Sequence, residues 1–474
     1  MHSLSSVSYR IKLILISGAI LIASALILKY IFEPSQRCNI VLISIDALNR
    51  SALDAYNHEA PELPVLGALA DYASVFENAY STASWTLPAH GSIFTGCYPD
   101  RHGGNRPEQR ISGSLPNLAE ILRNQNYFTV GFTDKGYVSS SFGFNRGFYI
   151  YDDWIDTLSQ ADLSKIPRNG EKNLQSGANL FDRGASFIKS WNEADGNFFL
   201  FLHTYIVHDY FMQYQWTVNN SNPVQDISSE YCLECLLGIK KCSDSEWDFL
   251  KKLYQTEVLR MDQGLGKLFK TLIDKDLWDS TLIIFLSDHG EGFQPDIDRI
   301  HHGGRLHEDL IKIPFMISGP GIEPARLYTP VSLVDILPTV LDLTGIQVPQ
   351  NIDGQSLKYV ITEEDDSDLR PLYAMEFFHM WKNGRRLNVD NSGNGWLSAA
   401  VIWDNYWYNQ NFHHDELYNM AKDPFQLNDL SSEATNLREF NALVNQRKEF
   451  KSIPLSSHPD KAIQDQLRSL GYIK

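Results

Sequence analysis

The chain has 474 residues and the composition of an ordinary globular protein, with 43% hydrophobic, 12% aromatic and 21% charged residues. At roughly 100–200 residues per domain, this length allows several domains, or one large α/β domain with a smaller appendage. The formal charge is −17, from 41 basic and 58 acidic residues. Because proteins that bind DNA or RNA usually present a positive surface to the phosphate backbone, this charge argues against a nucleic-acid partner.

An apolar run near the N-terminus is the first distinctive segment. Residues 13–28 are apolar except for two serines and a glycine, and Arg10 and Lys12 precede them. With its apolar flanks the run approaches the ~20 residues that span a bilayer. We therefore predict a membrane anchor over residues 1–33, with the rest of the chain on the extracytoplasmic side. A cleaved signal peptide is the alternative, since Ala23-Ser24-Ala25 resembles a cleavage site.

After the anchor, short apolar runs alternate with helical periodicity, which is typical of βαβ units around a parallel sheet. Residues 39–45, 198–202 and 281–287 are predicted to be strands buried on both faces. Open α/β sheets bind ligands at the carboxyl ends of their strands, so we expect the functional site there. The side chains that follow the three runs are Asp46, then His203 and His208, then Asp288 and His289.

Two helices can be placed from the sequence. Apolar residues at helical spacing predict a helix over 247–272, and Ser243 with Glu246 resembles a capping box before it. Thr86, with a proline two residues later, predicts a second helix that runs to Phe94 and has Thr86 as its N-cap. The backbone N–H groups at such a helix end attract tetrahedral anions. A metal beside the Thr86 hydroxyl could turn it into a nucleophile, although a threonine before a helix is usually an ordinary cap.

Four motifs, taken together and in this order, resemble the sulfatases and related hydrolases of the alkaline phosphatase superfamily. They are Ser-Ile-Asp-Ala-Leu at 44–48, Trp-Thr-Leu-Pro-Ala-His with Thr-Gly at 85–96, Ser-Asp-His-Gly-Glu at 287–291, and Val-Ser-Leu-Val-Asp-Ile-Leu-Pro-Thr at 331–339. The resemblance implies an α/β fold in which helices sandwich a mostly parallel sheet, with a small C-terminal α+β subdomain. It places the catalytic domain at 34–360, with an insertion at about 210–245, and the C-terminal subdomain at 361–474.

The resemblance also implies roles for single residues. Asp46, Thr86, Asp288 and His289 match metal-ligand positions. Thr86 in addition occupies the position of the nucleophile. The expected reaction centre is therefore a metal ion next to a threonine hydroxyl.

Further residues are implied as contacts of the substrate. His208 matches a histidine that contacts the bound anion, and His302 is expected to do likewise or to bind a second metal. Both are therefore candidate catalytic residues. Lys135, His90 and Arg305 are candidate substrate-binding residues.

The nucleophile position departs from the family pattern. Family sulfatases carry Cys or Ser at the start of C-x-P-x-R and convert it to formylglycine, which threonine cannot become. Residues 97–101, which begin with Cys97, match C-x-P-x-R literally. However, the Thr-Gly that should follow the nucleophile by about nine residues is at 95–96, which is the correct distance from Thr86. A formylglycine sulfatase that uses Cys97 is thus the less favoured alternative.

The metal ligands depart from the pattern as well. Ala47 stands where many sulfatases have another aspartate that helps to hold calcium. A missing carboxylate and the presence of His289 favour a divalent ion with mixed N/O ligands, so we predict Mn or Zn, with Ca as the alternative. One ion is expected, although His203, His208 and His302 could contribute to a second.

A threonine ester must be cleared by water or another acceptor, a route that suits phosphoryl chemistry. We therefore predict a membrane-anchored, extracytoplasmic, metal-dependent enzyme that cleaves or transfers phosphate or sulfate esters through Thr86. Its partners are an anionic ester and the membrane. A sulfatase-fold binding protein without activity is the alternative from another class, but Asp46, Asp288 and His289 are all retained.

Three cysteines at 232, 235 and 242 lie in the predicted insertion. Three cysteines form only a partial metal knuckle, and we place this segment outside the cytoplasm, where disulfides form. A disulfide is therefore the favoured interpretation. We predict one disulfide and one free thiol.

Overall fold

A computed structural model describes residues 37–153, 178–208, 210, 229–236, 239–294, 299–363, 370–377, 398–411, 414–432, 437–447 and 464. The predicted anchor over residues 1–33 lies outside these ranges. Among the helices within them, none combines the length and the apolar character needed to cross a membrane.

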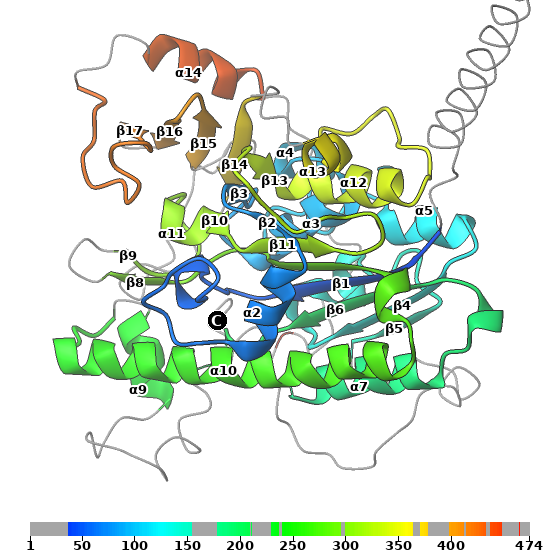
Figure 1. Cartoon of the computed structure of the whole chain (residues 1–474). Coiled ribbons are helices and arrows are strands. Elements are labelled where there is room, and N and C mark those ends of the chain that lie inside the picture. Colours follow the sequence, from blue (N-terminus) through cyan, green and yellow to red (C-terminus); the bar gives the residue numbers. More distant parts are fainter. Residues whose placement is uncertain are drawn as a thin grey trace, which may run out of the picture.

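An eight-stranded sheet lies at the centre of the molecule (Figure 1), with the order β12-β2-β11-β7-β1-β6-β4-β5. β1 (Asn39–Ile45) runs parallel to both of its neighbours, β6 (Phe198–Thr204) and β7 (Thr281–Ser287). These are the three predicted strands, and the prediction of a mostly parallel sheet is confirmed. β6 extends to Thr204, so His203 lies inside the strand rather than after it. The other strands are β2 (Ser74–Phe76), β4 (Phe128–Thr133), β5 (Ile150–Asp152), β11 (Phe315–Ser318) and β12 (Ala325–Leu327).

The two faces of β1 belong to different hydrophobic cores. Ile40 and Leu42 pack into one core, whereas Val41 and Ile43 pack into the other. Alternate side chains of a strand point to opposite faces, so an unbroken apolar run supplies both cores. The helices α3 (Thr86–Thr95), α5 (Leu118–Asn124) and α12 (Ile336–Leu343) cover the first face, and α2 (Pro64–Asp71), α7 (Ala178–Ser190) and α10 (Asp244–Asp274) cover the second (Figure 1).

The helix α10 confirms the one predicted over 247–272 and extends it at both ends. The Ser243 N–H donates to Oε2 of Glu246 at 2.7 Å, as the predicted capping box requires. Before this helix, Cys235 in α9 (Ser229–Leu236) forms a disulfide with Cys242. The predicted disulfide is therefore present, while the side chain of Cys232 lies outside the described part of the chain.

A four-stranded antiparallel sheet with the helix α14 (Leu437–Asn445) against it forms the C-terminal subdomain, as predicted. Its strands are β14 (Leu372–Glu376), β15 (Ser398–Trp403), β16 (Tyr406–Asn411) and β17 (Asp415–Asn419). Smaller sheets pair β3 (Ala79–Tyr80) with β10 (Lys312–Ile313) and β13 (Val331–Ser332), and β8 (Gly292–Gln294) with β9 (Arg299–His301). Short helices are α4 (Pro99–His102), α11 (Glu308–Ile311) and α13 (Lys358–Glu363).

A largely buried group of ion pairs joins the end of α14 to the main domain. Arg447 donates to Asp100 at 2.8 Å and to Asp353 at 3.2 Å, and its guanidinium lies 4.7 Å from the ring centroid of Tyr98. Arg101 reaches the same carboxylate of Asp353 at 3.0 Å. Burial alone would raise the pKa of Asp353, but Arg447 holds it below its ordinary value. Arg447 is therefore the cation that pairs with Asp100, and it shares Asp353 with Arg101.

We expect Arg447→Ala to lower the free energy of unfolding by roughly 2–4 kcal/mol, because it leaves the poorly solvated Asp100 without its cation and removes one of the two cations of Asp353. Urea unfolding followed by fluorescence measures the change. Lys270→Ala is the control, since Lys270 pairs with Asp274 at the surface with side-chain exposures of 72% and 57%. That variant should lose less than about 0.5 kcal/mol. Equal losses in the two variants would contradict a structural role for the buried group.

Candidate active site

The hydroxyl of Thr86 lies against the carboxyl end of β1. Its Oγ1 donates to Oδ2 of Asp46 at 2.9 Å, and both residues are buried. The helix α3 begins at Thr86 itself, with Trp85 at the N-cap position, so the prediction that Thr86 caps the helix is wrong. The reason is that its hydroxyl bonds to a carboxylate from the sheet instead of to the N–H groups of its own helix. This places the hydroxyl beside the predicted metal ligands.

Asp46, Asp288 and His289 form a buried group whose ligand atoms all lie within 4.8 Å of one another. Nε2 of His289 is 3.6 Å from Oδ1 of Asp46 and 3.5 Å from Oδ2 of Asp288. Atoms that share an ion at ~2.0–2.2 Å are about 3–3.6 Å apart, so this spacing suits one small divalent cation. The structure thus brings together the four residues that the sequence predicts as metal ligands, Thr86 included.

Oδ2 of Asp288 and Nε2 of His289 have no hydrogen-bond partner among the described residues. The other oxygen of Asp288 accepts from the N–H groups of Ala47 at 3.2 Å and His289 at 2.9 Å. Nδ1 of His289 lies 2.9 Å from the carbonyl oxygen of Gly290, which can only accept, so Nδ1 carries the proton and Nε2 presents a lone pair. Buried polar atoms without partners are costly, and a cation would satisfy both.

The electrostatics of the group also favour a cation. Burial, reinforced by the negative charge of Asp46, raises the pKa of Asp288 well above its ordinary value. Burial lowers the pKa of His289, although Asp288 opposes the shift. Without a metal, a proton on the carboxyl pair relieves their repulsion, and a divalent ion would replace this proton.

The turn that carries Asp46 is strained. Ala47 has a φ of +56°, a left-handed conformation that costs a residue with a Cβ of the order of 1 kcal/mol. Its N–H donates to Asp288, and its carbonyl accepts from the hydroxyl of Tyr254 at 2.8 Å. The same hydroxyl accepts from the N–H of Asn49 at 2.7 Å. These bonds hold the turn in the conformation that points Asp46 and Asp288 toward each other.

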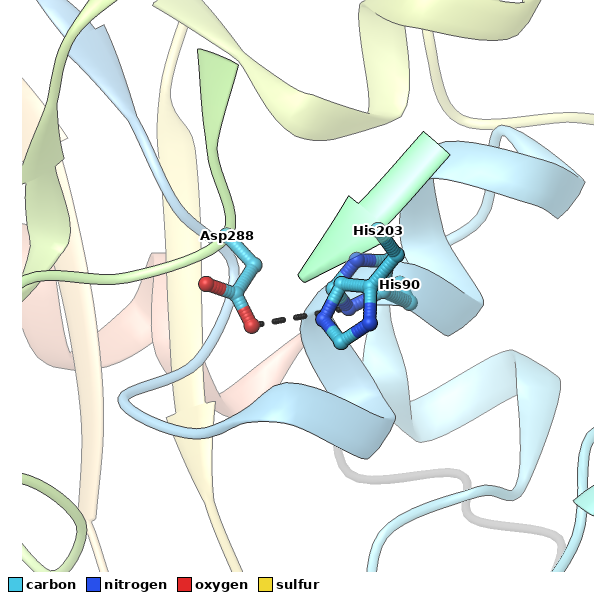
Figure 2. Close-up of side chains that lie close together, drawn as sticks. All are labelled: His90, His203 and Asp288. Carbon is cyan, nitrogen blue, oxygen red and sulfur yellow. Dashed lines mark ion pairs between the residues drawn. The ribbon is translucent and has the colours of Figure 1, made fainter. Parts of the chain in front are cut away.

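His90 and His203 lie beside Asp288 (Figure 2), with their ring centroids 4.6 Å apart. Nδ1 of His90 lies 2.9 Å from the carbonyl oxygen of Thr86 and 3.5 Å from Oδ2 of Asp288, while Nε2 lies 2.9 Å from Oγ of Ser44. Nε2 of His203 is 3.3 Å from Asp46, and burial lowers the pKa of His203 to about 3. Since both ring nitrogens of His90 have protein partners, Thr86 and Ser44, its predicted contact with the substrate would require one of these two hydrogen bonds to break.

His208 and His302, the two predicted anion contacts, lie next to the predicted metal ligands. The ring centroid of His302 is 4.7 Å from that of His289 and 4.8 Å from that of His208. Both side chains are buried. They extend the group of metal ligands into a larger cluster of histidines.

Arg305 and Lys135 are less directly placed. The guanidinium of Arg305 forms two bonds to Asp309, at 2.5 and 2.7 Å, and a third to the carbonyl oxygen of His301 at 3.2 Å. Lys135 follows β4 with a φ of +71°, and the N–H of its neighbour Asp134 donates to the carbonyl oxygen of His203 at 3.2 Å. Lys135 thus lies at the edge of the sheet where the candidate site is, whereas the guanidinium of Arg305 is already bonded to Asp309.

Three buried residues to which the sequence analysis assigns no role complete this region. Oε2 of Glu291 lies 2.7 Å from Nδ1 of His302, and Oε1 lies 3.3 Å from Nδ1 of His301. Glu376, in β14 of the C-terminal sheet, accepts from Oγ of Ser84 at 2.5 Å. The sequence carries a signal for two of them, because Glu291 ends the motif at 287–291 and His301 adjoins His302. No local signal marks Glu376, because its role depends on how the C-terminal sheet packs.

Cys97 lies at the opposite end of α3 from Thr86. A helix of ten residues spans ~15 Å, so a large gap separates the two side chains. Cys97 is buried, and burial raises the pKa of its thiol to about 11. The literal C-x-P-x-R match therefore does not coincide with the candidate metal site.

Two family models match the chain. Residues 38–346 match the model described as sulfatase, and residues 303–452 match the model described as N-sulphoglucosamine sulphohydrolase, C-terminal. Arylsulfatase K of Xenopus laevis is 22% identical over 445 residues, covering 84% of this chain and 80% of that protein. An ulvan-active sulfatase of Formosa agariphila is 25% identical over 363 residues, covering 72% of this chain and 68% of that protein.

Solved structures share the fold. A 2-O GAG sulfatase superimposes with a TM-score of 0.68 at 16% identity, covering 87% of this chain and 92% of that one. A phosphonate monoester hydrolase of Agrobacterium radiobacter superimposes with a TM-score of 0.66 at 20% identity, covering 86% and 94% of the two chains. The mixed α/β architecture with its large, mostly parallel sheet is thus that of these structures.

We expect metal binding to release protons, because the raised pKa of Asp288 lets this carboxyl hold a proton that the ion displaces, while His289 is already neutral. The dissociation constant for Mn²⁺ or Zn²⁺ should accordingly rise as the pH falls and the proton competes. Isothermal titration calorimetry in two buffers of different ionisation enthalpy measures the released proton. Asp288→Asn, the matched variant, should bind weakly and release none. Tight binding without proton release would contradict this assignment.

Proposed function

The chain belongs to the sulfatase family, and we propose that it is a metal-dependent hydrolase of sulfate or phosphate esters with Thr86 as its nucleophile. The observation that carries the proposal is the meeting of the Thr86 hydroxyl with Asp46, Asp288 and His289 in one buried group. The names of its relatives, arylsulfatase K and ulvan-active sulfatase, support esters of sulfuric acid. The phosphonate monoester hydrolases of similar fold support the related phosphorus chemistry.

In the proposed first step, Oγ1 of Thr86 attacks the sulfur or phosphorus atom and its proton passes to Asp46, to which it already donates at 2.9 Å. A divalent cation held by Asp46, Asp288 and His289 would polarise the ester and lower the pKa of the attacking hydroxyl. The N-terminal end of α3 adds the positive end of its dipole to the site, which favours an anionic group.

His208 and His302 act on the other side of the reacting group. His208 supplies the proton to the departing alcohol, so that the ester bond breaks while the bond to Thr86 forms, and the Nε2 lone pair of His302 takes a proton from the water of the second step. Water then attacks the threonine ester, releases sulfate or phosphate and restores the hydroxyl. This second step replaces the elimination that a formylglycine hydrate would use.

We further propose that the enzyme acts outside the cytoplasm and is held at the membrane by residues 1–33. The apolar run over residues 13–28 supports an anchor. The disulfide between Cys235 and Cys242 supports an oxidising compartment.

Thr86→Ala should lower kcat by at least ~10³-fold, because the variant lacks the attacking oxygen. Thr86→Ser keeps a hydroxyl and should retain measurable activity. Turnover of a chromogenic ester by the variants provides the measurement, and mass analysis of the peptide with Thr86 tests for the trapped ester.

Two further variants serve as controls for this experiment. Thr344→Ala removes a buried hydroxyl that donates to the carbonyl oxygen of Val340 at 2.7 Å, away from the site, and should keep its activity. Cys97→Ala should also remain active. Full activity of Thr86→Ala would overturn the proposal. Loss of activity in Cys97→Ala but not in Thr86→Ala would favour the formylglycine alternative.

After removal of metal by a chelator, we expect Mn²⁺ or Zn²⁺ to restore more activity than Ca²⁺. Ala47 supplies no carboxylate and His289 supplies a nitrogen, a ligand set that suits the softer ions. A panel of aryl sulfate, phosphate monoester, phosphodiester and phosphonate esters, assayed with each ion, identifies the substrate. Activity that is highest with Ca²⁺ would contradict the assignment of the metal.

A further inference from the structure

We propose that Glu291 is a positioning residue that orients the imidazole of His302 and fixes Nδ1 as its protonated nitrogen. The inference rests on the proposed function, in which His302 acts on the ester. It gives a role to a buried carboxylate that is neither a metal ligand nor a contact of the substrate.

The contacts of Glu291 define this role. Its Oε2 lies 2.7 Å from Nδ1 of His302 and its Oε1 lies 3.3 Å from Nδ1 of His301, while its own side chain is 1% exposed. An ionised carboxylate has no proton to donate, so both Nδ1 atoms must donate to it. A neutral His302 with Nδ1 protonated presents the lone pair of Nε2 on the opposite side of its ring.

The backbone around His302 needs such support. His301, Gly303 and Gly304 have φ values of +56°, +77° and +78°, so three of four consecutive residues adopt left-handed conformations. The N–H of Gly303 donates to the carbonyl oxygen of Ser84 at 3.0 Å, which ties this turn to the segment that precedes Thr86. Backbone bonds fix the turn, whereas Glu291 fixes the imidazole that the turn carries.

Glu291 is itself rigidly held. Its carbonyl oxygen accepts from Nδ2 of Asn49 at 2.7 Å, and the N–H of Gly290 donates to the carbonyl oxygen of Leu310 at 2.7 Å. A Cβ at Gly290 would lie 2.1 Å from the carbonyl oxygen of Asp309, so only glycine allows this close approach. Since His289 stands two residues before Glu291, one rigid segment fixes both the metal ligand and the orientation of His302.

The same three side chains, Glu291, His301 and His302, are close enough to hold a cation of their own. The distance between Glu291 and His302 favours a hydrogen bond instead. A separation of 2.7 Å between Nδ1 of His302 and the carboxylate is typical of a charge-assisted hydrogen bond, and it is shorter than the roughly 3–3.6 Å between two ligands of one ion. We therefore infer that Glu291 orients His302 rather than binding a metal with it.

Glu291→Gln tests the inference in the full chain, with the metal bound. The amide accepts with its oxygen but only donates with its nitrogen, so it cannot accept from both histidines and one imidazole must change its tautomer or turn away. We expect kcat to fall about 10–100-fold while KM changes less than about 3-fold and the metal content per chain stays the same. Unchanged kcat, or loss of bound metal in the variant, would overturn the proposal.

A double-mutant cycle with His302→Ala separates this role from a merely structural one. If Glu291 acts through His302, Glu291→Gln should lower kcat by less than about 2-fold when His302 is already absent. The proposal would be contradicted if the effects of the two substitutions on kcat multiplied, or if His302→Ala kept full activity. Glu257→Gln is the matched control, because Glu257 is also 1% exposed and bonded to Arg260 at 2.8 Å, in α10. It should keep wild-type kcat.

His302→Asn keeps the proposal testable if Glu291→Gln does not fold. The asparagine amide can still donate to Glu291 but has no atom in place of Nε2, so this variant should fold and lose kcat to a similar extent as His302→Ala. Full activity would overturn the inference. Thr86→Ala tests the proposed function separately. If this variant retained activity, Thr86 would not be the nucleophile, but the coupling between Glu291 and His302 could still be measured.

Discussion

The repulsion between two buried carboxylates, Asp46 and Asp288, is the constraint on which the rest of the site depends. Ile45 of β1 pairs with Ser287 of β7, so the residues that follow them emerge side by side at the same edge of the sheet. Both side chains are buried, and the pair cannot be fully ionised there without a compensating charge. The adjacent His289 and the hydroxyl of Thr86 complete a set of atoms whose spacing suits such a charge. A proton or a divalent cation can supply this charge, and the proposed metal ion would therefore stabilise the carboxylate pair as well as take part in catalysis.

Strained backbone turns aim the side chains of this site. Ala47, immediately after Asp46, and His301, immediately before His302, both adopt left-handed conformations although neither is a glycine. Each turn is held by bonds from another part of the chain, by Tyr254 for the first and by Ser84 and Glu291 for the second. Strain of this kind persists only where the surroundings fix it, and here it holds a ligand and a catalytic candidate in place before any substrate arrives.

The C-terminal subdomain contributes to this arrangement from a distance in sequence. Glu376 of its first strand accepts from Ser84 and from the N–H of Gly304, at 2.5 and 3.3 Å, and so bridges the segments that carry Thr86 and His302. Arg447 ties the far end of the same subdomain to Asp100 and Asp353. The small sheet thus supports the segments of Thr86 and His302 through buried, charge-assisted bonds, which are strong because little water competes for them.

The amino-acid sequence by itself determined the α/β class, the three central strands, the helix α10 and the residues that meet in the candidate metal site. Unbroken apolar runs and local motifs are properties of short segments, and ligands that follow parallel strands must meet at one edge of the sheet. Only the tertiary structure decided that the Thr86 hydroxyl bonds to Asp46 instead of capping its helix. It also decided that Arg305 bonds to Asp309, and that Glu291 and Glu376 hold the turn that carries His302. These contacts join segments far apart in the chain, and a side chain with several potential partners chooses among them only when packing brings one within reach.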